Sequence, residues 1–342
     1  MDDPIILAIP FFVLFMAVEV FVLRHAAHEH AADPATPVGY AAKDTATSIT
    51  MGFGSLFFKA LLKIAALVVF VAVYELSPLK IPMDQWWAWL LLLFAEDLSF
   101  YAYHRGHHRV RMLWATHVVH HSSQHYNLST AVRQDWSPFT APVFWLWLAV
   151  VGFPPWAILL AQSWNLLYQF LLHTEAVRKL PRPIELVMNT PSHHRVHHGV
   201  QDQYLDKNYG GIFIVWDRLF GTFEPEGERV RYGLTTNIET HNPVRVAYHE
   251  WVALLRDVRG ATSWRDRAGY VFRGPGWAPA AASAAPAPAG DAAPVDAAVH
   301  VDRGARVASP HGEGGDDGPG GGTGRAAVEP QQGVLPVAGR AG

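Results

Sequence analysis

The chain of 342 residues contains no cysteine. This absence excludes disulfide bridges, thiolate metal sites and cysteine nucleophiles. Basic runs are also missing, and the formal net charge is only -3, so the composition excludes a strongly basic nucleic-acid-binding domain. The end of the chain lacks large apolar residues, since no aromatic residue follows Trp277 and only one leucine or isoleucine, Leu335, does. We therefore expect residues 275–342, rich in Ala, Gly and Pro, to form a disordered tail in which His300 and His311 are incidental.

Long apolar runs dominate the rest of the chain. The runs Ile5–Leu23, Gly52–Leu76 and Trp86–Tyr103 are each long enough to cross a bilayer at ~1.5 Å per residue. The first is preceded by acidic residues rather than basic ones, which favours a retained helix over a secretory signal. A fourth apolar stretch, 138–172, is interrupted by glycine and proline and is predicted to be a helical hairpin with arms short for a full span. The fold class predicted is an all-α, multi-pass membrane helical bundle.

Basic residues are distributed unevenly between these runs. Arginines and lysines occur in segments 24–50, 104–137 and after His173, whereas residues 1–4 have none and 77–85 only Lys80. The positive-inside rule then places the N-terminus outside and the basic segments in the cytoplasm. We divide the chain into an N-terminal membrane helix and cytoplasmic loop (1–50), a core of spans and motifs (51–230), a peripheral cytoplasmic segment (231–274) and the tail (275–342).

Histidine is the abundant residue, with 19 copies. Three motifs, HRGHH, HVVHH and HRVHH, place histidines at i, i+4 or at i, i+3, i+4, which is one face of a helix. A further histidine ends the hairpin. All lie on the predicted cytoplasmic side. The nine candidate ligands are His104, His108, His117, His120, His121, His173, His194, His197 and His198.

Nine imidazoles exceed the ligand set of one zinc ion, which takes about four ligands. They fit two metals of higher coordination, and iron is favoured because zinc has no redox chemistry whereas iron activates oxygen. We expect a cytoplasmic histidine-rich helical cap that holds a di-metal site. His107 and His193 lie off the ligand faces. The looser cluster of His25, His28 and His30 is interpreted as a solvated interfacial segment.

Other polar residues near the motifs have two interpretations each. Asp97, acidic within a span, either orients a ligand imidazole or pairs with Lys59 or Lys63 in the neighbouring span. Three residues after the first triplet are candidates either for a lipid head-group site or for capping and packing: Tyr126, Asn127 and Arg133. Asp206 and Asn208, after the second triplet, complete the candidate set.

At these motifs the chain resembles the fatty acid hydroxylase and sterol desaturase superfamily of membrane di-iron enzymes. Within it the stretches 116–134, 169–175 and 189–223 are most similar to alkylglycerol monooxygenases. The resemblance implies that the histidines bind two irons, with His173 a ninth ligand, and that a membrane lipid is oxidised with O2. It also implies an external reductant, a tetrahydropterin or a ferredoxin- or cytochrome-type donor.

Two functions from other classes remain open. A zinc-dependent membrane hydrolase would need a general base such as Glu175 or Asp206. A metal transporter would place its ligands near mid-membrane, whereas these histidines lie at or beyond helix ends. The lipid, the electron donor, and the choice among hydroxylation, desaturation and ether cleavage are not determined by the sequence.

Overall fold

The computed structural model describes residues 4–29 and 39–279. Within these ranges the chain is helical and forms no β-strand, only the isolated bridges Met188–Phe213 and Gly199–Tyr232. The all-α prediction is confirmed for this part of the chain. The predicted tail from 280 onward, His28, His30, His300 and His311 lie outside the side chains that the structure describes.

The first three helices are the long ones. They are α1 (Pro4–Glu29), α2 (Ala42–Leu76) and α3 (Trp86–Arg109). In the described residues two helices, over Pro4–Ala26 and Ala42–Leu76, are long and apolar enough to cross a membrane. Only 6% of the most apolar window of each is buried by the described residues, so both present bare apolar surface, as a helix in lipid does. The third predicted span forms α3 but is not among these two, because its second half carries acidic residues and the first histidine motif.

The apolar stretch 138–172 forms a bent return, as its glycine and prolines predict. It comprises the 3-10 turns η1 (Pro138–Thr140) and η2 (Pro142–Phe144), then α6 (Leu146–Val150) and α7 (Pro155–Leu172). At the bend Gly152 has φ +98°, and a Cβ there would lie 2.4 Å from the Leu79 carbonyl oxygen. Only glycine fits this close approach of the two loops.

An apolar core lies between α2, α3, α6 and α7. Its buried members include Phe70, Leu92, Leu148, Phe153 and Ile158. Shorter helices follow in the chain: α4 (Arg111–His121) and α5 (Leu128–Ala131) before the return, and later α8 (Arg182–Val187), α9 (Pro191–His197) and α10 (Val215–Phe220). The last two are α11 (Pro243–Gly260) and α12 (Trp264–Phe272).

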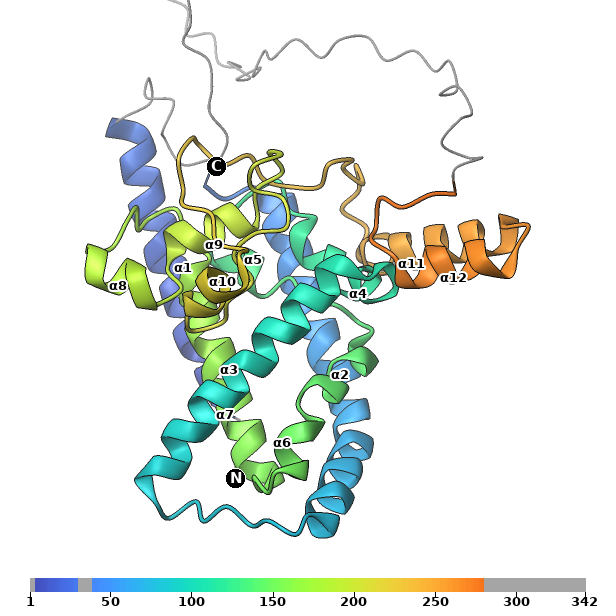
Figure 1. Cartoon of the computed structure of the whole chain (residues 1–342). Coiled ribbons are helices and arrows are strands. Elements are labelled where there is room, and N and C mark those ends of the chain that lie inside the picture. The colour runs from blue at the N-terminus through green and yellow to red at the C-terminus, as the bar shows by residue number, and fades with distance from the viewer. Residues whose placement is uncertain (1–3, 30–38, 280–342) are drawn as a thin grey trace, which may run out of the picture. The chain divides into compact units, whose positions relative to one another are not determined.

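Figure 1 shows how these elements are arranged along α2. The start of α1 and the loop between α2 and α3 lie at one end of the bundle, and α4 and α9 lie at the other. All three histidine motifs therefore gather at one end of the long helices. The start of α1 and the 77–85 loop are separated from these motifs by the length of the long helices.

Two acidic side chains of α3 are buried within the bundle. Glu96 accepts hydrogen bonds from Trp145 Nε1 (3.1 Å) and Asn165 Nδ2 (2.8 Å). Asp97 accepts from the backbone N–H groups of Ile212 (2.6 Å) and Phe213 (3.0 Å). Asp97 also accepts from Asn165 Nδ2 (3.2 Å) and Trp216 Nε1 (2.9 Å), so its described hydrogen bonds go to these groups and not to a ligand imidazole. Its carboxylate instead anchors the 210–213 loop to α3, because two charge-assisted bonds to backbone N–H groups hold that loop in place.

The contacts of Trp277 correct the predicted boundary between the peripheral segment (231–274) and the tail (275–342). A Cβ at Gly269 of α12 would lie 2.2 Å from the indole of Trp277, and the Tyr270 ring is 5.3 Å away. The folded segment thus continues to at least residue 277. Composition could not show this, since the contact is made by one aromatic residue in an otherwise small-residue stretch.

Candidate metal centre

The nine histidines form two groups whose ligand nitrogens converge. One group has five members: His104, His108, His117, His121 and His197. The other has four: His120, His173, His194 and His198. Within each group the ligand atoms lie within 4.8 Å of one another. The structure brings together every histidine that the sequence singled out as a ligand.

Each triplet is divided between the two groups. In α4, His117 and His121 join the five-histidine group while His120 faces the other. In and after α9, His194 and His198 join the four-histidine group while His197 faces the five. With ~3.6 residues per turn, the residues at i and i+4 point to one side of the helix. The residue at i+3 lies about 60° around the helix axis from residue i, in the direction away from i+4. One short helix thereby serves two sites, which the single-face interpretation did not foresee.

Backbone carbonyls set the tautomer of several rings. His120 Nδ1 lies 3.2 Å from the Arg133 carbonyl oxygen, and His173 Nδ1 lies 2.8 Å from that of Gln169. In the other group His104 Nδ1 is 2.9 Å from the Tyr209 carbonyl oxygen, and His197 Nδ1 is 2.9 Å from that of Lys207. A carbonyl only accepts, so each Nδ1 carries the proton and each Nε2 is left with a lone pair.

The geometry of those lone pairs fits a bound cation. His120 Nε2 and His173 Nε2 are 3.0 Å apart, and His173 Nε2 is also 3.0 Å from His194 Nε2. Two acceptors at that distance repel unless a positive charge lies between them. Two further buried nitrogens have no hydrogen-bond partner among the described residues, His108 Nε2 and His198 Nε2. Unpaired buried nitrogens are costly, and a metal satisfies them.

Burial keeps the rings neutral, as metal ligands must be. It lowers the pKa of His197 to about 3 and the pKa of His120, His121 and His198 well below the usual value. The main cause is loss of hydration of the charged form. Neighbouring imidazoles lower these pKa values further. The donor set is therefore preorganised for metal at neutral pH.

The three candidates after the first triplet make capping and packing contacts. Asn127 caps α5, with its Oδ1 3.0 Å from the Ser129 N–H, and the Arg133 guanidinium is buried against Asp44 at 2.9 Å. Tyr126 donates to the Leu172 carbonyl at 3.0 Å and stacks on His173 with ring centroids 5.6 Å apart. These contacts favour the capping and packing interpretation for the three residues. Of the three side chains only that of Tyr126 contacts a candidate ligand ring, and Arg133 reaches His120 through its backbone carbonyl.

The candidates after the second triplet shape the loop that follows α9. Asp206 and Asn208 both have positive φ, 60° and 55°, a conformation that Asp and Asn tolerate better than most residues. Asp206 pairs with Arg109 at 2.9 Å, with one oxygen 3.9 Å from His108 Nδ1. Asn208 Nδ2 donates to the His193 carbonyl at 3.1 Å. This loop presents the Lys207 and Tyr209 carbonyls to the ligands.

The two histidines placed off the ligand faces belong to neither group. His107 lies between the Tyr103 carbonyl (2.7 Å) and Thr140 Oγ1 (2.9 Å), and His193 Nε2 is 3.0 Å from Glu185. Both are buried. The prediction that both lie off the ligand faces is confirmed, and their burial places them inside the fold rather than at its surface.

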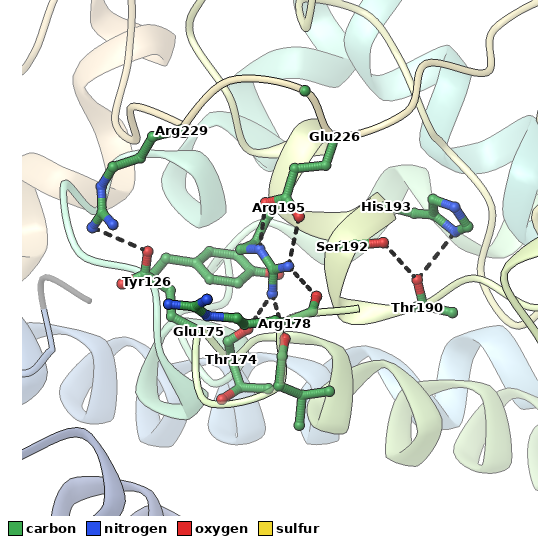
Figure 2. A network of polar contacts seen from close by, with 12 residues as sticks. Tyr126, Thr174, Glu175, Arg178, Thr190, Ser192, His193, Arg195, Glu226 and Arg229 are labelled. Carbon is green, nitrogen blue, oxygen red and sulfur yellow. Dashed lines mark hydrogen bonds and ion pairs between the residues drawn. The ribbon is translucent and has the colours of Figure 1, made fainter. Parts of the chain in front are cut away.

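Sequence reasoning missed the arginine inside the third motif. Figure 2 shows the Arg195 guanidinium between Glu226 and the chain after His173. Nε and Nη2 donate to Glu226 at 2.6 and 2.7 Å, and Nη1 donates to the Thr174 and Val177 carbonyls at 3.0 and 2.7 Å. This fork ties α9 to the segment beside His173. Its signal was an arginine between two ligands, but nothing in the sequence marked Glu226 as the partner.

Comparison with known proteins identifies the stretch that holds the site. Residues 89–222 match the fatty acid hydroxylase family, and all nine histidines fall within them. This stretch belongs to the fatty acid hydroxylase family. The resemblance inferred from the motifs is confirmed.

Relatives of the fatty acid hydroxylase domain include named lipid enzymes. The chain is 40% identical over 242 residues to alkylglycerol monooxygenase of Homo sapiens, covering 69% of this chain and 53% of that protein. It is 36% identical over 256 residues to that of Caenorhabditis elegans, covering 72% and 49%. It is 27% identical over 162 residues to an ornithine lipid hydroxylase of Rhizobium tropici, covering 45% and 49%. The chain spans about half the length of these relatives, and no solved structure matches it.

Proposed function

We propose that this chain is a membrane-bound, O2-dependent lipid monooxygenase whose two histidine groups each hold one iron ion. The observation that carries the proposal is the convergence of nine buried neutral imidazoles in two adjacent sets. The five-histidine set comes from α3, α4 and α9, and the four-histidine set from α4, α9 and the end of α7. Iron held there supplies the redox chemistry that O2 activation requires, which zinc lacks.

The membrane is the proposed source of the substrate. Helices α1 and α2 are long and apolar enough to span it, and α3 and the 138–172 return are proposed to insert beside them. The ligands then lie at the cytoplasmic ends of α3 and α7, where a lipid held in the bilayer reaches them by its head-group end. This placement favours a long-chain amphiphile over a soluble metabolite.

The proposed substrate class is an ether lipid, supported by the names of the alkylglycerol relatives. Hydroxylation of the C–H bond next to the ether oxygen consumes O2, two electrons and two protons, and yields one water and a hemiacetal. The hemiacetal collapses to a fatty aldehyde and a glycerol. The electrons come from a tetrahydropterin or a ferredoxin- or cytochrome-type donor.

The protein contributes positioning and exclusion of water. Tyr126 stacks on His173 and on Tyr232, with ring centroids 4.8 Å apart in the second pair. The carbonyls of Gln169, Arg133, Tyr209 and Lys207 fix the rings that face the metals. Outer contacts of this kind orient ligands and raise their basicity.

The test measures metal and product together. Purified protein in nanodiscs is expected to hold close to two irons per chain. With a 1-O-alkylglycerol, a reductant and 18O-labelled O2, it should form a fatty aldehyde that carries the label when reduced at once to the alcohol. Zinc in place of iron, with lipid hydrolysis that needs no O2, would support the hydrolase instead. Labelled hydroxylation of a sterol or fatty acyl lipid, without aldehyde, would reject the ether lipid and keep the monooxygenase.

A further inference from the structure

Helices α11 and α12 carry an apolar surface that the described residues leave exposed. Trp264 is 80% exposed, Val252 64%, Phe272 64% and Leu255 50%. The opposite face of α11 is buried through Val246, Ala247 and Leu254. One side of α11 is therefore buried in the fold, and the other side carries exposed apolar residues.

The exposed stripe of α11 is accompanied by arginine. Val244, Val252 and Leu255 are spaced i, i+8 and i+11, so they share one side of the helix. Residues 243–273 contain six arginines and three acidic residues. Two of those acidic residues, Glu250 and Asp257, are engaged by Arg111 at 2.8 and 2.7 Å. The exposed basic residues, Arg245, Arg256, Arg259, Arg265 and Arg273, give this surface a positive character.

The direction of these helices matches a membrane surface. In Figure 1, α11 and α12 lie across the direction of α2, at the end of the bundle where α4 lies. With α2 spanning the bilayer, α11 and α12 run parallel to its plane. A helix with an apolar side, flanking arginines and an exposed tryptophan is typical of the lipid–water interface.

We propose that α11 and α12 lie on an anionic lipid surface, with Trp264, Val252 and Leu255 in the head-group layer and the arginines on lipid phosphates. This inference rests on the proposed membrane insertion of α1 and α2. The inference concerns how the chain contacts the membrane and not the metal chemistry, so it goes beyond the proposed reaction.

Arg111 connects this surface to the metal centre. Besides the two carboxylates that its side chain binds, Arg111 donates its backbone N–H to the Arg273 carbonyl at 2.8 Å. Its guanidinium lies over the Tyr270 ring, 5.6 Å from the ring centroid. It is the first residue of α4, which carries His117, His120 and His121. Docking of α11 and α12 on lipid therefore fixes the depth of α4 relative to the bilayer surface, beside the proposed substrate.

The cysteine-free chain allows a direct test with single spin labels. Trp264→Cys and Leu255→Cys report on the surface, Gln203→Cys in an exposed loop after α9 is the aqueous control, and Val68→Cys on α2 is the bilayer control. In nanodiscs of phosphatidylcholine and phosphatidylglycerol, labels at 264 and 255 should be relaxed more by O2 than by a water-soluble nickel chelate. The label at 203 should show the reverse.

Lipid charge is tested on the Trp264→Cys background. Reversing Arg256, Arg259 and Arg265 to glutamate, or removing phosphatidylglycerol, should make the label at 264 shallower. No change in either case would overturn the anionic surface.

Three label patterns would overturn docking on lipid. If the labels at 264 and 255 show the same aqueous accessibility as the label at 203, while the label at 68 lies deep in the bilayer, this inference alone is rejected. Labels shielded from both reagents would show a protein cover, from this chain, a second copy or an electron-donor protein. An aqueous reading at 68 would reject the proposed membrane insertion as well.

Discussion

At the scale of single residues, the candidate centre depends on which ring nitrogen carries the proton. Carbonyls of Gln169, Arg133, Lys207 and Tyr209 each accept from an Nδ1, so the facing Nε2 atoms present lone pairs. The carbonyl partner thus orients these rings as a carboxylate hydrogen-bonded to a ligand histidine does in many metal sites.

The first prediction concerns one ligand. His120→Ala should remove one metal site, so that iron falls from about two per chain to one or fewer and O2-dependent lipid oxidation drops more than the ~10–100-fold that outer partners cost. Elemental analysis and an oxidation assay on the same membranes measure both. His241→Ala, an exposed histidine outside the groups, is the control and should retain both. Full activity in His120→Ala would contradict the ligand assignment.

The second prediction concerns pH. Burial lowers the pKa of His197 to about 3, against an ordinary value of 6.5. Below pH ~6.5 the unfolded chain binds protons that the folded chain excludes, so stability is highest above that pH and falls as pH drops toward 3. Metal-free protein should therefore show a lower thermal midpoint at pH 5.5 than at pH 7.5. Metal-loaded protein should resist longer, since bound metal keeps the rings unprotonated. Equal midpoints for metal-free protein at both pH values would contradict this burial.

At the scale of elements, short helices are held by long-range polar contacts. α9 has only seven residues, Pro191–His197, too few to be stable alone. Arg195 within it is buried and saturated by Glu226 and by carbonyls of the segment after His173. The position of two ligands in α9 thus depends on a residue that binds no metal.

The third prediction follows from this fork. Arg195→Lys keeps the charge but loses the planar bidentate geometry. Metal affinity at the four-histidine group should fall by roughly 10–100-fold, as for other residues that orient ligands. Competition with a chelator measures it. Arg229→Lys is the matched control, because Arg229 is more exposed and makes a single 3.5 Å contact with Glu175. An equal loss of metal affinity in both variants would show that the effect of replacing arginine by lysine is general and not specific to Arg195.

At the scale of the whole molecule, the long helices separate two ends of the chain. The start of α1 and the 77–85 loop lie opposite the histidine motifs (Figure 1). By the positive-inside rule, the distribution of arginine and lysine predicts that the histidine end faces the cytoplasm.

The fourth prediction tests that assignment. Because the chain has no cysteine, Asp84→Cys and Asp202→Cys each create a single thiol at an exposed position. In intact cells a membrane-impermeant maleimide should label position 84, and position 202 only after lysis. The reverse pattern would invert the orientation while leaving the fold intact.

The fifth prediction concerns the C-terminal segment. A chain ending after Pro279 keeps Trp277 against α12 and should retain iron content and activity. A chain ending at Gly274 loses that contact and should be less stable, by about 1–3 kcal/mol for an aromatic side chain of this partial burial. Thermal unfolding of the two chains in detergent measures the difference. Loss of iron in the longer chain would show that residues 280–342 support the site.

The sequence by itself predicted the helical class, the resemblance to the fatty acid hydroxylase family and the nine histidines that gather in two groups. Helical spacing is a local property, so His104 with His108, and each triplet, could be recognised without knowing their neighbours. Tertiary structure alone decided how the triplets divide between two groups, and that His173 joins His120, because their ring nitrogens meet across 53 residues. It also decided that Asn127 caps α5, that Arg133 pairs with Asp44 and that Arg195 pairs with Glu226. Such contacts depend on which distant segments fold together, and no local pattern records that.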